Sequence, residues 1–467
     1  MSFQPTRNLY LQKYLALVGI LAAPGVWNAF PLVYPDTCRY LNIAFECHIS
    51  CFSPVAFPLI MRPFFLFGPW WMMFSQCLIA ALVLLEVSVL LSLRYIYLVS
   101  IVVLSGYFFT SSLLLSDVYF AVLFFVIFIY LENGKIINCI PVVILSTSHA
   151  SFPIISILAM LSVAPFRAFD VRRLMAVCAA ACCALFINIY FTYSYYGTAT
   201  SPCSPAFLAA RFIESDPNFF QDYVARHPDG ILSINPTDFE AVQGIVAKTG
   251  RRDVYLWDKK SPIYVYGWLE GGNTPSSRTS RASRELADFV SSYIVNHPFR
   301  VAIDSVRNAF RYVAIAHTYS HTEVASVDIH EVWCVNPPKY SLQANGLIYY
   351  YLFNKVTVVG YYLSFIIILL SFVMKFVNAK FRTISQESHN GSYCGSIVNR
   401  FALFSMVVYI ASGVITSNIS VVDGRFQQWA YVLLFTAAWL LFKKSVLHGI
   451  ISKILCKINC MSCQSPR

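Results

Sequence analysis

Hydrophobic residues run through this chain in long, almost uninterrupted stretches that are separated by short polar segments. A stretch that can cover a hydrocarbon core of about 30 Å is typical of a transmembrane helix. Such stretches lie at 14–33, 69–92, 96–115, 118–132, 171–193, 355–374, 399–418 and 427–442. The pattern therefore predicts a polytopic membrane protein whose first stretch is a retained span and not a cleaved signal peptide.

The segment 137–164 does not fit a single span, because it is too long and a polar run at 146–151 interrupts it. Pro153 lies just beyond this run and disfavours a continuous helix. Two short helices joined as a hairpin, with His149 near its tip, fit better. Counted in this way, the chain makes about ten crossings.

Residues 195–345 have a different character, since they carry most of the acidic residues and several turn signals. Helices are predicted at 207–211 and 284–310; in the second, Leu286, Phe289, Val290 and Tyr293 recur at helical spacing. The predicted fold class is all-α: a polytopic membrane protein of about ten spans, with a soluble, mainly α-helical domain inserted between them.

Composition and charge agree with this interpretation. The chain is 57% hydrophobic and only 12% charged. Ordinary soluble domains are about 45–50% apolar and about 25% charged. The net charge is +11, but the sequence contains no long basic run of the kind that binds nucleic acid. We therefore expect no nucleic-acid partner. Lys and Arg instead gather in alternate loops, as cytoplasmic loops do, whereas the short outer loops carry only Arg39, Arg62 and Arg425. Both chain ends are therefore placed in the cytoplasm.

The resulting organisation has four parts. They are an N-terminal transmembrane module at 1–194 with its first outer loop at 34–68, the exterior domain at 195–345, a C-terminal transmembrane module at 346–443, and a basic cytoplasmic tail at 444–467. The exterior domain has no Asn-x-Ser/Thr site, which favours a bacterial periplasm, and hence the inner membrane, over a eukaryotic lumen.

The cysteines leave several pairings open. Cys203 and Cys334 bracket the exterior domain, and a disulfide between them would suit an oxidising compartment. The first outer loop adds three more candidates for pairing on the same side, namely Cys38, Cys47 and Cys51. In the tail, the CxxxCxxC run at 456–463 lacks a fourth ligand, so no metal site is predicted.

Four polar residues, namely Asp36, Asp117, His149 and Arg425, are expected within a few positions of the outer membrane surface. Each has a simpler explanation: either acid can cap a helix, the histidine can be satisfied locally, and the arginine can anchor the interface. Their convergence on one side nevertheless favours a functional site. The candidate substrate-binding residues of this site are His149, Arg39, Arg62, Arg425, Glu46 and His48.

Glu86 is the one acid deep within a predicted span, where it can pair with Arg94. A proton-coupled transporter needs such a group, but a single one is weak support.

The order of these features resembles the GT-C superfamily, the membrane glycosyltransferases that use polyprenyl-phosphate-linked sugars. The resemblance covers about 1–193 and 398–443, and the exterior domain is not part of it. Asp36 stands alone where many members carry two acids together. The matching features are Tyr34-Pro35-Asp36 after the first span, Ser116-Asp117 opening the fourth, the hairpin tip at His149, the Arg172-Arg173 turn, and Gly424-Arg425-Phe426 before the last span.

The resemblance implies an inverting sugar transfer on the outer face, from a polyprenyl-phosphate donor to a lipid-linked or cell-envelope glycan. Asp36 would be the general base and Asp117 would orient the acceptor or Asp36 itself. An outer-face arginine would hold the donor phosphate, and His149 would bind sugar or phosphate. No nucleotide cofactor is implied, and a divalent cation is left open.

Three alternatives remain. A transporter or flippase of lipid-linked glycans would show internal repeats and charges deep in several spans. A glycan polymerase or ligase would use arginines of the large outer loop, where Arg300, Arg307 and Arg311 share one helical face. The third alternative is a membrane scaffold without catalysis.

Overall fold

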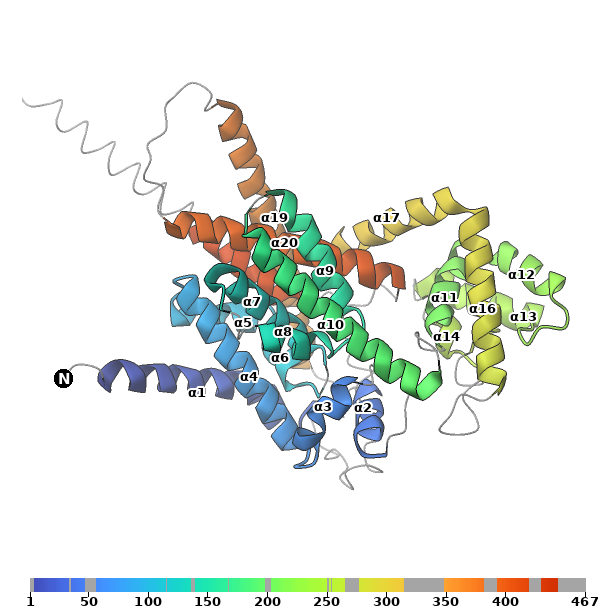
Figure 1. Cartoon of the computed structure of the whole chain (residues 1–467), viewed down its shortest axis with the longest axis horizontal. Coiled ribbons are helices and arrows are strands. Elements are labelled where there is room, and N and C mark those ends of the chain that lie inside the picture. Colours follow the sequence, from blue (N-terminus) through green and yellow to red (C-terminus); the bar gives the residue numbers. More distant parts are fainter. Residues whose placement is uncertain are drawn as a thin grey trace, which may run out of the picture.

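The computed structural model describes residues 4–32, 35–46, 56–114, 116–135, 139–166, 168–197, 203–249, 252, 254–264, 277–314, 348–381, 393–419 and 430–443. Within these ranges the chain is helical and has no strand, apart from one isolated bridge between Leu32 and Leu113. Figure 1 shows a bundle of helices from the N-terminal and C-terminal parts of the chain, with a second group of helices beside it. The predicted all-α fold class is confirmed for this part of the chain.

The N-terminal part of the bundle contains ten helices in the described ranges. They are α1 (Gln4–Trp27), α2 (Pro35–Glu46), α3 (Ala56–Phe65), α4 (Pro69–Leu90), α5 (Tyr95–Leu104), α6 (Tyr107–Ser112), α7 (Val118–Asn133), α8 (Cys139–Ser146), α9 (Phe152–Val163) and α10 (Val171–Tyr196). The single helix predicted at 96–115 is wrong, because Gly106, at φ +72°, separates α5 from α6. The predicted break in the segment 137–164 is confirmed, since α8 and α9 are distinct helices.

The C-terminal part contributes α19 (Ile348–Phe381), α20 (Tyr393–Ile419) and a helix at Ala430–Lys443. Each stretch predicted as a span overlaps at least one described helix, although 96–115 is divided between α5 and α6. Among the described residues, four helices are long and apolar enough to cross a membrane, as an integral membrane protein requires. Their spanning segments are Asn8–Trp27, Pro69–Leu90, Val171–Ser194 and Ile397–Asn418.

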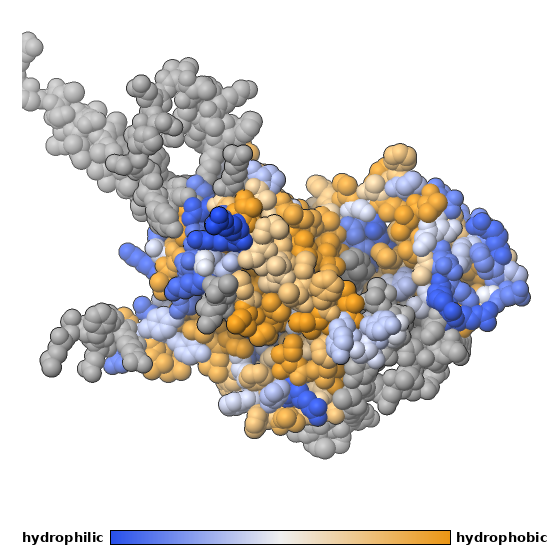
Figure 2. All heavy atoms as spheres, viewed as in Figure 1, coloured by the Kyte–Doolittle hydropathy of each residue, from blue (hydrophilic) through white to orange (hydrophobic). Residues whose placement is uncertain are grey.

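Helix α7 lies at the centre of the bundle, because all of its residues from Val118 to Phe128 are buried. Helix α10 instead leaves large apolar side chains exposed, among them Met175, Phe186 and Tyr190. A helix that is apolar on every side and still exposed suits contact with lipid. The bundle thus has a packed interior and an apolar outer surface, which Figure 2 shows in orange.

Neighbouring helices α1 and α4 run in opposite directions. The hydroxyl of Tyr10 donates to Glu86 Oε1 at 2.9 Å, and at the other end Gly25 packs against Met73. This contact corrects the prediction for Glu86, which pairs with a tyrosine of α1 and not with Arg94. The end of α1 and the start of α4 therefore lie at the same end of the bundle.

A buried ion pair marks the opposite end. Arg400 of α20 donates to both carboxylate oxygens of Glu132 in α7, from Nε at 2.7 Å and from Nη2 at 2.5 Å. Arg173 of α10 donates to the carbonyls of Leu131 and Glu132, each at 2.6 Å. The end of α7 thus meets the starts of α10 and α20. Consequently the start of α7 shares its end of the bundle with the ends of α10 and α20.

The segment between α10 and α19 builds a separate hydrophobic core around Phe212, Phe220, Phe239 and Phe289. The inserted domain, as we call it here, contains α11 (Ser204–Ser215), α12 (Pro217–Arg226), α13 (Pro236–Thr249), α14 (Val254–Trp257), α16 (Ser277–Asn296) and α17 (Pro298–Ala314). The single helix predicted at 284–310 is wrong, because the chain breaks at Pro298 into α16 and α17.

Cys203, directly before α11, forms a disulfide. Its predicted partner Cys334 lies outside the described residues, as do Cys47 and Cys51.

Candidate active site

The segment after α1 is joined to the segment before α7. The backbone N–H of Leu32 donates to Ser112 O at 3.1 Å, and that of Leu114 donates to Leu32 O at 2.9 Å. The hydroxyl of Thr37 then donates to the carbonyl of Leu114 at 2.9 Å. Because Asp36 immediately precedes Thr37 in the first turn of α2, these bonds fix the backbone of Asp36 beside the segment that leads into α7.

One turn further along α2, a second contact joins this helix to the segment before α7. The hydroxyl of Tyr40 lies 2.9 Å from Ser116 Oγ, and both groups are buried. The ring of Tyr40 also packs edge-on against Phe57 of α3, with 5.5 Å between the ring centroids. Tyr40 lies four residues after Asp36, and Ser116 comes directly before Asp117. The two acidic positions that the sequence predicted to converge therefore lie on neighbouring segments.

Asp117 is buried, with only 2% of its surface exposed. It stands at the N-cap position of α7, yet its side chain makes no capping hydrogen bond and its backbone is helical, at φ −62° and ψ −30°. The simpler explanation, a capping aspartate, is therefore wrong for this residue. The positive end of the α7 dipole favours a carboxylate here, although burial of the charge is costly.

Further polar groups surround this junction inside the apolar core. The side-chain amide of Gln76 donates to Leu113 O at 2.7 Å, while the hydroxyls of Ser111 and Ser112 donate to Leu21 O at 3.0 and 2.7 Å. Within the described part of the chain, Gln76 Oε1 and the hydroxyls of Thr110 and Tyr119 are buried without a hydrogen-bond partner. Such atoms are rare in folded proteins and suit a site that takes up water or a polar ligand.

Gln76 and Tyr119 did not appear among the residues predicted from the sequence. A glutamine within the apolar run 69–92 was a usable signal, because an amide is costly in hydrocarbon. Tyr119 gave no such signal among so many tyrosines.

His149 lies in the turn between α8 and α9, as predicted. Its Nδ1 accepts a hydrogen bond from the backbone N–H of Ser151 at 3.2 Å and lies 2.7 Å from Ser151 Oγ. The imidazole packs on Phe152, which packs on Phe120, with centroid separations of 5.1 and 5.2 Å. Phe120 is one turn beyond Asp117 in α7, so His149 lies at the same end of the bundle as the two acids.

Of the other predicted site residues, the structure describes the side chain of Arg62. Arg62 is exposed in the last turn of α3. Arg39 and Glu46 belong to α2, but their side chains, like that of Asp36, are outside the described part of the structure. His48 and Arg425 lie outside the described residues altogether.

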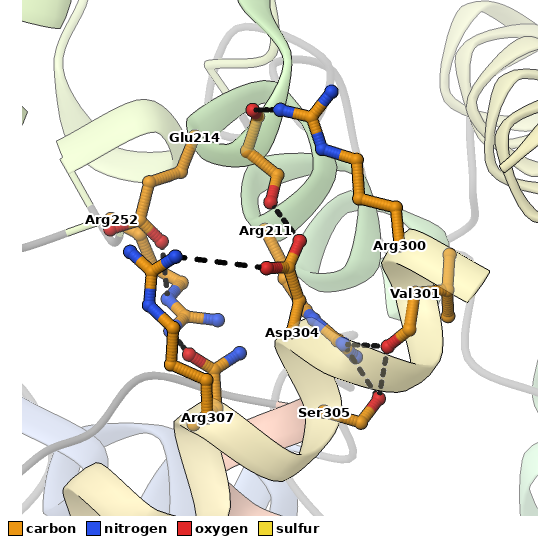
Figure 3. A network of polar contacts seen from close by, with 10 residues as sticks. Arg211, Glu214, Arg252, Arg300, Val301, Asp304, Ser305 and Arg307 are labelled. Carbon is orange, nitrogen blue, oxygen red and sulfur yellow. Dashed lines mark hydrogen bonds and ion pairs between the residues drawn. The ribbon is translucent and has the colours of Figure 1, made fainter. Parts of the chain in front are cut away.

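Two buried arginines, Arg211 and Arg252, connect the inserted domain to the end of α20. Figure 3 shows their contacts within the inserted domain, with Ser305 and Val301 for Arg211 and with Glu214 for Arg252. Arg211 of α11 donates to Asn418 O at 3.4 Å and to Ser305 Oγ at 2.7 Å. Arg252 donates to Ser417 O at 3.5 Å and pairs with Glu214 at 3.2 Å. Because the last carbonyls of a helix carry partial negative charge, cations are favourable there.

Burial, and then the nearby charge of Arg252, lowers the pKa of Arg211 from its usual value. The contacts of Arg211 and Arg252 with α20 place the inserted domain at the end of the bundle that also holds Asp117 and His149. The sequence carries no signal for this contact, because Arg211 and Arg252 are far from α20 along the chain and meet it only in the folded protein.

The chain was also compared with known proteins. No protein-family model, no curated protein and no solved structure matches it.

Proposed function

We propose that this protein is a membrane glycosyltransferase that moves a sugar from a polyprenyl-phosphate donor to a glycan or lipid acceptor on the outer face of the membrane. The observation that carries the proposal is the junction of α2 with the segment before α7, which brings the backbone of Asp36 close to the buried Asp117. Two acidic residues on neighbouring segments at one end of the bundle suit a reaction that moves a proton from an acceptor hydroxyl.

The placement in the membrane is part of this proposal. The chain crosses the bilayer about ten times, with both ends in the cytoplasm and the inserted domain in the periplasm of a bacterial cell. Support comes from the distribution of Lys and Arg and from helices at every predicted span. The disulfide at Cys203 is consistent with an oxidising compartment for the inserted domain.

In the proposed reaction, the acceptor oxygen attacks the anomeric carbon of the donor sugar. The bond between that carbon and the phosphate oxygen breaks, and polyprenyl phosphate leaves with the bonding electrons. The hydroxyl proton of the acceptor passes to Asp36, the general base. Attack from the side opposite the leaving phosphate inverts the anomeric configuration.

Asp117 orients the acceptor or the base, because it is buried and directly follows Ser116, which contacts Tyr40 of α2. Gln76, Thr110 and Tyr119 offer the buried polar atoms that an acceptor sugar or a bound water would satisfy. His149 is the candidate for contact with sugar or phosphate, and Arg62, Arg39 and Arg425 are the candidates for the donor phosphate.

The proposal is tested by turnover in proteoliposomes. The purified protein is supplied with a panel of polyprenyl-phosphate sugars and lipid-linked acceptors, and release of polyprenyl phosphate is followed by mass spectrometry. We expect release from one donor, which Asp117→Asn reduces. Transbilayer movement of an intact lipid-linked glycan, without cleavage of any donor, would instead indicate a flippase.

A further inference from the structure

Helix α17 carries a stripe of large apolar side chains that are mostly exposed. Phe299, Ile303, Val306 and Phe310 are exposed by 84, 66, 71 and 70%. Their spacing of four, three and four residues puts them on one narrow face of the helix. A soluble domain rarely exposes such a row, which normally marks a surface that is covered by a partner or by a membrane.

The opposite face of α17 is packed against the protein. The ring of Tyr312 is fully buried, lies against Gly413, and its hydroxyl is 3.1 Å from Ser412 Oγ of α20. Further along, the amide of Asn418 donates to Ser305 O at 3.3 Å. Helix α17 therefore runs antiparallel to the last turns of α20, with Ser305 level with Asn418 and Tyr312 level with Ser412.

This packing determines how far the stripe reaches along the bundle, measured from the end of α20. At ~1.5 Å per residue, Ser412 lies about 10 Å inside the end of α20 at Ile419. Tyr312 is accordingly part of the hydrophobic core of the bundle, not of the core of the inserted domain. Phe310, its near neighbour, must then be exposed at a level where α20 presents Val414 and Ile410 to the surroundings.

Charge supports the same arrangement. Arg300, Arg307 and Arg311 follow one flank of the stripe, and the first two also pair with Asp216 and Asp304. Apolar residues on one face with arginines along its edge are typical of helices that lie in a membrane interface, where the guanidinium groups reach the lipid phosphates. In Figure 2, orange atoms continue from the bundle onto α17.

We infer that α17 is an interfacial helix, whose apolar stripe is inserted into the outer leaflet of the phospholipid bilayer. It enters obliquely, with Phe310 and Val306 at the acyl chains and Phe299 at the headgroups. This inference depends on the chain being embedded in a membrane, but not on sugar transfer. Two contacts then hold the inserted domain at the membrane. One is the packing of Arg211 and Arg252 against the end of α20, and the other is the apolar stripe in the lipid.

The test uses the full-length protein in phosphatidylcholine vesicles. A fluorescent non-natural amino acid replaces Phe299, Ile303 or Phe310, one at a time, and quenching is measured by lipids with a nitroxide at the headgroup or in the acyl chain. Because these side chains are at least 66% exposed, we expect the replacements to leave folding intact. Phe186, exposed on α10, serves as the lipid-facing control, and Glu240, exposed on α13, as the aqueous one.

We expect acyl-chain quenching to exceed headgroup quenching at Phe310, the reverse at Phe299, and no quenching at Glu240. Absence of quenching at Phe310 and Ile303, with strong quenching at Phe186, would overturn the inference and leave the membrane placement intact. Absence at Phe186 as well would reject both. Protection of the stripe by a second copy of the chain would appear as energy transfer between labelled molecules and would also overturn the inference.

Discussion

At the scale of single residues, the hydrogen bond between Tyr40 and Ser116 is the most direct link between the two acidic segments. Tyr40→Phe removes this bond and leaves the ring packed on Phe57. We expect a loss of about 1 kcal/mol in the free energy of unfolding, as for other buried hydrogen bonds. Transfer is expected to fall by up to about 100-fold, because a small displacement of a catalytic group has a large effect on rate.

Tyr190→Phe is the matched control, since Tyr190 is an exposed tyrosine on the outer surface of α10. Unfolding in detergent and turnover in proteoliposomes are measured for both variants. Equal turnover of the two would show that the contact between Tyr40 and Ser116 does not position the site.

The sequence was informative about acidic residues at this scale and uninformative about their neighbours. Asp36 and Asp117 stand out because charge is rare in and near the apolar runs. The groups that position or surround them, such as Tyr40 and Tyr119, belong to residue types that are abundant throughout the chain. Only the packing of α2 against the segment before α7 distinguishes them.

At the scale of elements, the contact between α17 and α20 depends on a glycine. A Cβ added at Gly413 would lie 2.7 Å from Tyr312 Cδ1, so the ring would have to move. We expect Gly413→Ala to destabilise the protein by roughly 1–3 kcal/mol, the usual cost of overpacking. Gly19→Ala in α1 has open space around it and should stabilise slightly, by up to about 1 kcal/mol.

Thermal unfolding in detergent compares the two glycine variants. A Gly413→Ala protein that is as stable as Gly19→Ala would contradict the close approach of α17 and α20.

The ion pair between Glu132 and Arg400 connects elements from the two ends of the chain. The side chain of Glu132 is only 4% exposed, so Glu132→Gln leaves the arginine largely buried without its partner. We expect a loss of about 3–5 kcal/mol in the free energy of unfolding. The double variant Glu132→Leu with Arg400→Met should recover much of this loss, because it buries no charge; no recovery would mean that the pair is not the source of the effect.

Element positions were predicted well because the apolar runs are long and their interruptions are sharp. The errors lie where one residue breaks a periodic pattern, as at Gly106 between α5 and α6 and at Pro298 between α16 and α17. At Gly106 the apolar run continues across the break, whereas at Pro298 the apolar positions of α17 lie on a different face from those of α16. The pairing of elements distant in sequence, such as α17 with α20, leaves no trace in a single sequence.

At the scale of the whole molecule, the inserted domain and the two acidic segments lie at one end of the bundle, and the Glu132–Arg400 pair lies at the other. In sealed vesicles with the inserted domain outside, an impermeant amine reagent should label Lys248 and Lys259, which lie on α13 and shortly after α14. It should not reach Lys135 and Lys443, which are expected on the cytoplasmic side. Equal labelling of Lys135 and Lys259, read by mass spectrometry, would reject the topology.

The central claim is that Asp36 is the base of an outer-face sugar transfer. The most direct measurement is the rate of polyprenyl phosphate release in proteoliposomes by the unaltered protein and by Asp36→Asn, with donor binding measured in parallel. Asparagine keeps the shape of the side chain but cannot take up the proton, so we predict a rate lower by roughly 10²–10⁴-fold with donor affinity unchanged. Release by Asp36→Asn at the rate of the unaltered protein would contradict the account.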